Sequence, residues 1–154
     1  MFLSLLSKYI EYIVMAYSLS FSKSILVLIF ISDKTRRGET EFISTKVMSE
    51  LLNIPKPTLS VILSNLMRAG ILQTKEGVNG GVRMAKGEDR ITLLDLLIAI
   101  ENEKPLFQTE YELNVSGKRP DNAKKTVNSI LKQIEKTIKE DLKKTTLKNI
   151  LDSL

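Results

Sequence analysis

Residues 44–70, STKVMSELLNIPKPTLSVILSNLMRAG, decide the fold of this chain. Ser44 is a suitable N-cap for a short helix, and Pro55 prevents that helix from continuing. A second helix starts near Lys56, carries its apolar residues on one face and stops at Gly70. The apolar residues are Val47, Met48, Leu51 and Leu52 in the first helix and Leu59, Ile62, Leu63 and Leu66 in the second. Two short helices joined by a tight turn predict a helix-turn-helix.

A short hairpin is predicted directly after these helices. Residues 71–74 (ILQT) and 82–85 (VRMA) suit short strands, and KEGVNGG separates them. We expect the tip residues Gly77, Asn79, Gly80 and Gly81 to supply the positive backbone dihedrals that such a hairpin requires. A helix-turn-helix followed by a hairpin is the order of a winged helix.

The flanking segments predict further helices and loops. Residues 25–31 (ILVLIFI) indicate a helix buried on most of its faces, and residues 33–41 indicate an exposed loop. Thr92 is the expected cap of a helix over LLDLLIAIE that closes the core over the wing base. Its expected core residues are Leu93, Leu94, Leu97, Ile98 and Ile100.

A loop over residues 103–120 leads to the longest predicted helix, which Asp121 opens. From Ala123 onward its apolar residues recur every three or four positions, and Thr145 or Thr146 caps a last short helix. The apolar stripe also contains Val127, Ile130, Leu131, Ile134, Ile138 and Leu142. The chain is therefore expected to be mainly α-helical with one small β-hairpin.

The composition excludes several kinds of site. Among the 154 residues there is no cysteine and no histidine, so no disulfide, thiolate nucleophile, zinc finger or cysteine-ligated cluster can form from this chain alone. The side chain most used as a general acid or base near neutral pH is also missing. We expect no enzyme activity, no metal and no cofactor.

The net charge of +5 is unevenly distributed. The first 116 residues are neutral, with thirteen basic and thirteen acidic side chains, while residues 117–154 carry ten basic and five acidic ones. Within the first part, residues 36–86 carry eight basic and four acidic side chains, and residues 88–112 carry two and seven. This pattern predicts one basic face on a neutral domain.

The first residues, MFLSLLSKYIEYIVM, are rich in apolar side chains. Charged residues such as Lys8 and Glu11 interrupt them, so no uncharged run reaches the roughly 18 residues of a membrane-spanning helix. We therefore expect a cytoplasmic protein without a membrane segment. Residues 1–14 are either a start-site extension before Met15 or an extra N-terminal helix, and the sequence leaves both open.

The predicted second helix of the helix-turn-helix is the candidate DNA reader. The start of such a helix fits the major groove and places a few side chains against base edges. The candidates off its apolar stripe are Pro57, Thr58, Ser60, Val61, Ser64 and Arg68. Lys56 is placed for a phosphate, as are Ser44, Thr45 and Lys46 at the start of the preceding helix.

The wing adds a thin tip with charge beside it. Lys75 and Arg83 flank the glycines, and Asn79, Gly80 and Gly81 complete the predicted contact set. Arg83 either enters a narrow minor groove or pairs with an acidic neighbour at the wing base. A helix-turn-helix also occurs in protein-interaction modules, so a winged helix that never touches DNA is the competing hypothesis.

Three runs together resemble a known family: IPKPTLSVILSNLMRAGIL, GVNGGVRMA and ITLLDLLIAIE. They are similar to the Rrf-two family of bacterial winged-helix regulators, to which IscR, NsrR and CymR belong. The resemblance extends over residues 15–154. It implies a homodimeric regulator, usually a repressor, that binds a partly palindromic operator on double-stranded DNA.

The resemblance also implies that the long helix is the dimerisation element, which agrees with its apolar stripe. A winged helix-turn-helix domain is thus expected over residues 15–103, and a loop with dimerisation helices over residues 104–154. The alternative for the stripe is a helix packed on its own domain.

This chain departs from the family in one respect. Several members hold an iron–sulfur cluster on three cysteines in the loop after the helix that follows the wing. That loop here reads LFQTEYELNVSGKRPDNAKK, without a cysteine. The input signal stays open between a small-molecule effector, a protein effector and constitutive action, and the alternative without DNA binding includes a regulatory partner of a metabolic enzyme.

Overall fold

The structure is a computed structural model that describes the backbone of residues 2–154 and the side chains of residues 19–154. Its helices are α1 (Phe2–Arg36), α2 (Thr45–Leu51), α3 (Lys56–Arg68), α4 (Leu93–Glu101), α5 (Lys118–Lys144) and α6 (Leu147–Leu151), with the short 3-10 helix η1 (Glu88–Arg90). Two strands, β1 (Leu72–Lys75) and β2 (Gly81–Met84), form the hairpin. This mainly helical winged fold with a long C-terminal helix confirms the predicted fold class. The backbone of residues 2–14 belongs to α1, and the side chains of residues 1–14, on which the choice between a start-site extension and an extra helix falls, lie outside the described residues.

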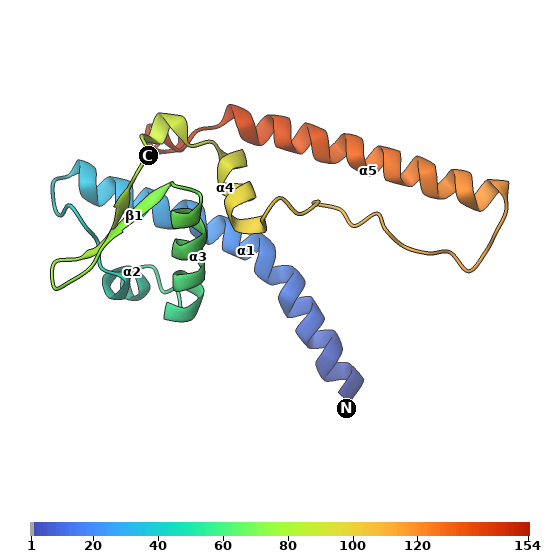
Figure 1. Ribbon diagram of the computed structural model, residues 1–154, viewed down its shortest axis with the longest axis horizontal. Helices are drawn as coiled ribbons and strands as arrows, with labels where there is room; N and C mark the ends of the chain where they lie inside the picture. Colours follow the sequence, from blue (N-terminus) through green and yellow to red (C-terminus); the bar gives the residue numbers. More distant parts are fainter. Residues whose placement is uncertain (1) are drawn as a thin grey trace.

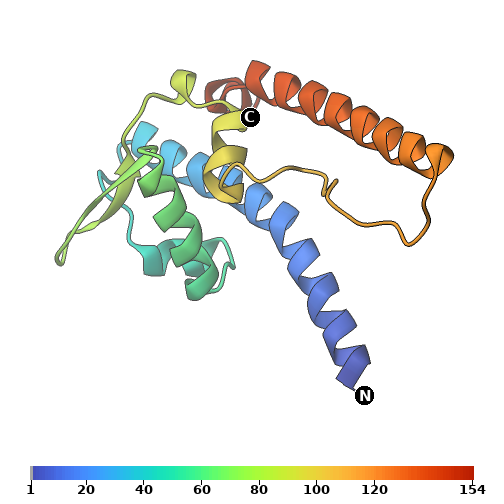
Figure 2. The ribbon, with the colours of Figure 1, turned by 45° about the vertical axis from the view of Figure 1, so that its right-hand side comes forward.

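The winged domain packs around the second half of α1. Figures 1 and 2 show α2, α3, the hairpin and α4 gathered there, while α5 extends far to one side. The core contains buried residues from each of these elements, among them Leu28, Met48, Leu59, Val82 and Leu96. In the described part of the chain, no helix is long and apolar enough to cross a membrane.

The helix-turn-helix forms through local signals. Ser44 caps α2 by accepting a hydrogen bond from the Val47 amide at 3.2 Å. In the turn, the Ser49 hydroxyl donates to the Ile54 carbonyl at 2.7 Å, and Asn53 adopts a positive φ of 50°. These bonds fix the angle between α2 and α3, so the predicted cap and turn are confirmed.

Gly70 ends α3 in a Schellman motif. Its φ is +67°, its amide donates to the Met67 carbonyl at 2.9 Å, and the Ile71 amide donates to the Leu66 carbonyl at 3.0 Å. Ile71 is consequently buried as the chain enters β1.

The wing is an antiparallel hairpin with a third backbone segment beside it. Leu72 pairs with Met84 and Lys75 with Gly81, while Ile43 forms an isolated antiparallel bridge to Val82. Amide-to-carbonyl bonds of 2.9 Å join Ile43 and Val82 in both directions. The segment just before α2 is thereby fastened to the wing.

The expectation that all four tip residues of the wing adopt positive φ is wrong for two of them. Gly77 and Gly81 have positive φ values of +102° and +147°, whereas Asn79 and Gly80 do not adopt positive φ. Gly80 is required by space, because a Cβ there would lie 2.2 Å from the Lys75 carbonyl oxygen. At Gly81 a Cβ would lie 2.3 Å from the Ile43 carbonyl oxygen.

Gly81→Ala is therefore expected to destabilise the wing and its bridge to Ile43. The substitution combines an unfavourable φ with a backbone collision, and we expect a loss of about 1 to 3 kcal/mol in the free energy of unfolding. Gly38→Ala is the matched control, since Gly38 has a φ of +68° but nothing within 4 Å of an added Cβ. Urea denaturation measures the free energy of unfolding of both variants. Equal losses of stability would show that the backbone collision at Gly81 adds nothing to the cost of its φ.

Several element boundaries and core assignments differ from the sequence-based ones. The predicted loop 33–41 begins only after Arg36, because α1 continues and Arg36 binds Glu88 of η1 at 2.6 Å. Residues 25–31 are buried on most of their faces, as predicted, with Leu26 the one exposed residue of this run at 55%. In α4 the core residues are Leu96, Leu97 and Ile100, while Ile98 faces outward at 36% exposure.

After α5, which extends away from the winged domain, the C-terminal helix α6 packs against that domain again. This helix begins at Lys118, three residues before the expected Asp121, since Pro120 is tolerated in a first turn. Thr146, and not Thr145, caps α6. The Leu147 amide donates to the Ile91 carbonyl at 2.8 Å, which anchors the end of α5 at the start of α4.

Candidate nucleic-acid interface

Helix α3 presents a short, polar outer face. Its inner face is the predicted one: Leu59, Ile62, Leu63 and Leu66 are all buried. The exposed residues are Lys56, Pro57, Ser60, Val61, Ser64 and Arg68. Thr58 is half-buried, so it lies at the edge of this face. The small side chains allow the helix backbone to approach a groove closely.

Two helix starts lie at this surface with their first amides unpaired inside the helix. Pro55 occupies the cap position of α3 and Pro57 lies in its first turn, while Ser44 caps α2. Lys46 and Lys56 are exposed beside these starts, and Thr45 is half-buried. Positive helix ends with lysines beside them favour phosphate groups.

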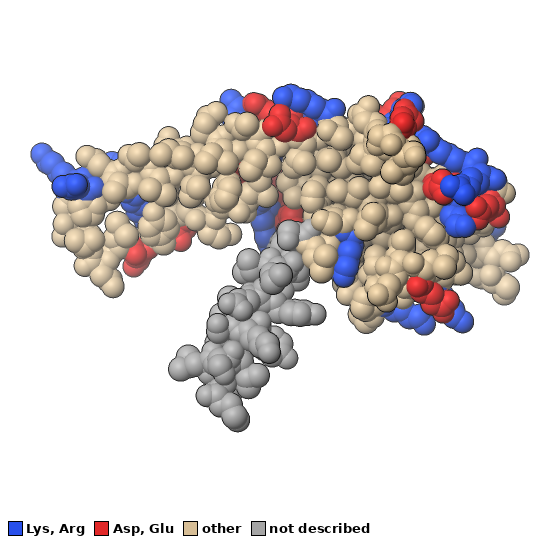
Figure 3. All heavy atoms as spheres, turned by 180° about the vertical axis from the view of Figure 1, so that it is seen from behind, with Lys and Arg blue, Asp and Glu red and all other residues tan. Residues whose placement is uncertain are grey.

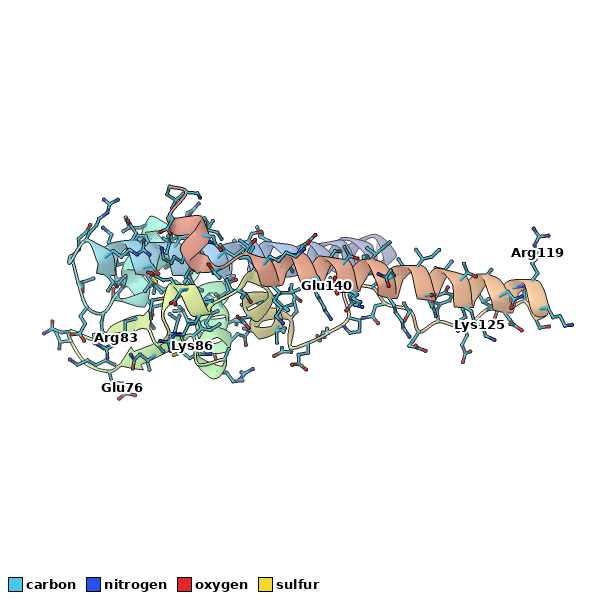
Figure 4. The ribbon with its side chains drawn as sticks, turned by 90° about the horizontal axis from the view of Figure 1, so that it is seen from above. Glu76, Arg83, Lys86, Arg119, Lys125 and Glu140 are labelled. Carbon is cyan, nitrogen blue, oxygen red and sulfur yellow. The ribbon has the colours of Figure 1, made fainter. Side chains whose placement is uncertain are left out.

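The wing tip projects away from the domain. Lys75 and Asn79 are exposed, Val78 is fully exposed, and Gly80 and Gly81 are half-buried. Figure 4 shows Glu76 and Arg83 on this hairpin, at the opposite end of the molecule from Arg119. Between the tip, the 40–44 segment and α2 lies an open groove of about 540 Å³. The predicted wing residues Lys75, Asn79 and Gly80 therefore border a common groove with the start of α2 at Ser44.

Arg83 is held at the wing base in this structure. Its guanidinium forms an ion pair with Glu41 and lies 4.7 Å above the Phe42 ring. Lys75 lies 5.4 Å from the same ring, on the neighbouring strand. In the alternative amide orientation of Gln73, its oxygen accepts from Arg83 Nε at 2.8 Å. Of the two interpretations of Arg83, the structure shows the acidic pairing.

Sequence reasoning missed three residues of this surface. Glu41 and Phe42 reach the wing only through the Ile43–Val82 bridge, which has no local sequence signal. Lys86 follows β2 and donates to the Ala69 carbonyl at the end of α3, at 3.4 Å. A cation near a helix C-terminus is a known pattern, but the pairing is long-range.

A second candidate surface lies on α5. Four large apolar residues of the predicted stripe are exposed: Val127 by 45%, Ile130 by 53%, Ile134 by 43% and Ile138 by 36%. Leu131 and Leu142 are half-buried. Figure 3 shows a long uncharged strip along this arm, with charged side chains at its far end and along its upper edge. An apolar helix face left open to this extent is unusual for a surface helix.

The side of α5 next to the exposed stripe is occupied by the chain's own linker. The Asn128 amide donates to the Thr109 carbonyl at 3.2 Å, Lys124 donates to the Tyr111 carbonyl, and Glu135 accepts from the Leu106 amide at 3.2 Å. An extended run from 106 to 111 and a helical run from 124 to 135 both span about 17 Å, so the two match.

Lys139 completes this contact by binding Glu135 at 2.6 Å. Its hydrogen bond is the main cause that holds the pKa of Glu135 below the usual range. The carboxylate is therefore charged at neutral pH, and its contribution to stability is lost as the pH falls through that lowered pKa. The exposed apolar stripe is left uncovered by the linker.

A model of one protein family, described as "Rrf2: Iron-dependent Transcriptional regulator", matches residues 17–153. The chain belongs to the Rrf2 family. Relatives agree: a protein named as an HTH-type transcriptional regulator, YffB of Lactococcus lactis, is 28% identical over 140 residues, covering 90% of this chain and 88% of its own length. A second HTH-type regulator, slr0846 of Synechocystis, is 43% identical over 64 residues, or 42% of this chain and 44% of its own.

Solved structures show the same fold. CymR of B. subtilis, titled the global cysteine regulator, has a TM-score of 0.62 at 21% identity and covers 88% of this chain and 95% of its own. IscR of T. potens has a TM-score of 0.62 at 19% identity and covers 87% of this chain and 84% of its own. This Rrf2 protein is thus a helix-turn-helix transcriptional regulator and not an enzyme, which confirms the predicted family and class.

The iron in the family description has no matching ligands here. Fe–S clusters rely on cysteine thiolates, in some centres together with histidine, and this chain has neither cysteine nor histidine. Within residues 19–154, acidic side chains also do not gather in groups of three or more that could hold a metal ion. The residues of this Rrf2 protein do not fit an iron–sulfur cluster.

Proposed function

We propose that this Rrf2 protein is a homodimeric, sequence-specific DNA-binding repressor of the cytoplasm that works without an iron–sulfur cluster. One observation carries the proposal: α3, with its polar outer face, packs against α2 and the wing strand β1, and each of the three carries an exposed lysine. In this arrangement α3 reads base edges in a major groove, while Lys46, Lys56 and Lys75 bind phosphates.

Dimerisation is supported by the open stripe on α5. Two copies that pack these stripes against each other bury Val127, Ile130, Ile134 and Ile138 from each chain, which stay exposed by 36% to 53% among residues 19–154 of the single chain. A two-fold dimer presents two α3 helices, which suits a partly palindromic operator. The role as repressor follows the resemblance to family members.

The decisive experiment is a binding assay on DNA selected from a random duplex pool by the purified protein. We expect tight binding to the selected sequence and much weaker binding to scrambled duplex, with affinity falling as salt rises because phosphate contacts release counterions. A chelator should leave both affinities unchanged. Failure to select any sequence would favour a winged protein-interaction module, for instance a partner of a metabolic enzyme.

A further inference from the structure

A carboxylate lies within the cationic part of the wing. Glu41 pairs with Arg83, while the Phe42 ring lies 4.7 Å from Arg83 and 5.4 Å from Lys75. The side chain of Glu41 is 67% exposed and that of Arg83 is 36% exposed. The pair is therefore open to solvent on one side, next to the groove formed by the 40–44 segment and the wing tip.

The backbone fixes this arrangement. The two hydrogen bonds between Ile43 and Val82 hold the 41–43 segment against β2, and their antiparallel register brings Phe42 beside Arg83, with Glu41 one residue further along. Gly81 allows the close approach, since its missing Cβ leaves room for the Ile43 carbonyl. The backbone thus keeps Glu41 within reach of the Arg83 guanidinium, with which it forms the ion pair.

An exposed ion pair of this kind contributes little to stability, about 0 to 1 kcal/mol. On a phosphate-binding surface, however, a carboxylate repels DNA and also occupies the guanidinium that a groove would attract. Glu41 therefore weakens DNA binding overall, and its presence here calls for a role other than raising the affinity for DNA.

We propose that Glu41 is a specificity-determining residue that withholds Arg83 from ordinary DNA and releases it only to a narrow minor groove. This inference rests on the proposed DNA-binding function. A narrow, A/T-rich minor groove has a stronger negative potential than average duplex DNA, so it competes better with Glu41 for the guanidinium. On random DNA, Arg83 stays paired and contributes no contact.

The expected result for Glu41→Gln follows from this competition. Without the carboxylate, Arg83 is free on any duplex, so affinity for random DNA should rise roughly three- to tenfold with a salt slope steeper by about one unit. Affinity for the selected operator should rise much less, because Arg83 is already engaged there. The ratio of operator to random affinity should therefore fall.

Glu76→Gln is the matched control. Glu76 is an exposed carboxylate on the same hairpin, and it forms no ion pair among those described for the wing. Its loss removes one negative charge without releasing Arg83, so both affinities should rise together and their ratio should be kept. In an Arg83→Gln background, Glu41→Gln should behave like Glu76→Gln.

The outcomes separate the two proposals. If the parent protein selects no operator, the proposed function fails before Glu41 is tested. Suppose that the parent binds its operator but Glu41→Gln keeps the ratio of operator to random affinity, or lowers both affinities. Glu41 then only stabilises the wing, and the inference is wrong. A persistent fall of the ratio in the Arg83→Gln background would also overturn it, because the effect would not pass through Arg83.

Discussion

Replacing Ile130 and Ile134 together with Asp is expected to convert the protein to monomers. Both side chains lie near the middle of α5 and are exposed in the single chain by 53% and 43%. Because about half of each side chain is already covered, burying the rest against a partner is worth about 1 kcal/mol, and a dimer buries four of them. Four buried carboxylates in their place would need charge partners or hydrogen-bond donors, which the apolar stripe does not provide. The dimer dissociation constant should therefore rise more than about a thousandfold.

The monomer itself should remain folded. Neither isoleucine belongs to the core of the winged domain, so circular dichroism of the variant should match that of the parent. Operator affinity should fall by roughly a hundredfold or more, because a monomer engages one half-site without the help of its partner. Sedimentation and the DNA-binding assay measure the two effects.

Ser129→Asp with Gln133→Asp is the matched control on the same helix. These residues line a shallow hollow with Lys125, Lys132 and Lys136, away from the apolar stripe. The control adds the same charge and should stay dimeric. If the isoleucine variant also stays dimeric, the stripe is not the interface and another surface joins the subunits.

The sequence predicts those parts of the fold that local signals control. The Ser44 cap, the Pro55 turn, the Gly70 stop and the Thr92 cap all appear as expected. Each depends on residues within a few positions of one another, so a single segment carries the information.

The sequence does not reveal features that join distant segments. The Ile43–Val82 bridge brings Glu41 beside Arg83, a contact across 42 positions. Polar side chains of α5 bind backbone groups of the linker, and backbone acceptors leave no periodic pattern to detect. Because the sequence does not show where the linker lies, it predicts equal exposure along the apolar stripe of α5. In the structure, Leu131 is half-buried and Ile130 is exposed.

Substitutions on the outer face of α3 and in the wing are expected to divide into two classes of effect on DNA binding. Ser60 and Ser64 are exposed and bear short hydroxyl groups, so they reach base edges. Each Ser→Ala change should cost about 1 to 3 kcal/mol on the operator and leave binding to random duplex almost unchanged. Thr58→Ala should cost less, since Thr58 is half-buried at the edge of this face.

Lys56→Ala and Lys75→Ala should behave differently, because a lysine that contacts phosphate releases counterions without reading sequence. Each should weaken operator and random DNA by similar factors and flatten the salt slope by about one unit. Lys125→Ala is the control, since Lys125 is also exposed but lies on α5, far from the wing, as Figure 4 shows. Titrations on both duplexes at several salt concentrations measure these effects. If Ser60→Ala weakens random DNA as much as the operator, or if Lys125→Ala matches Lys56→Ala, then α3 and the wing are not the DNA-reading surface.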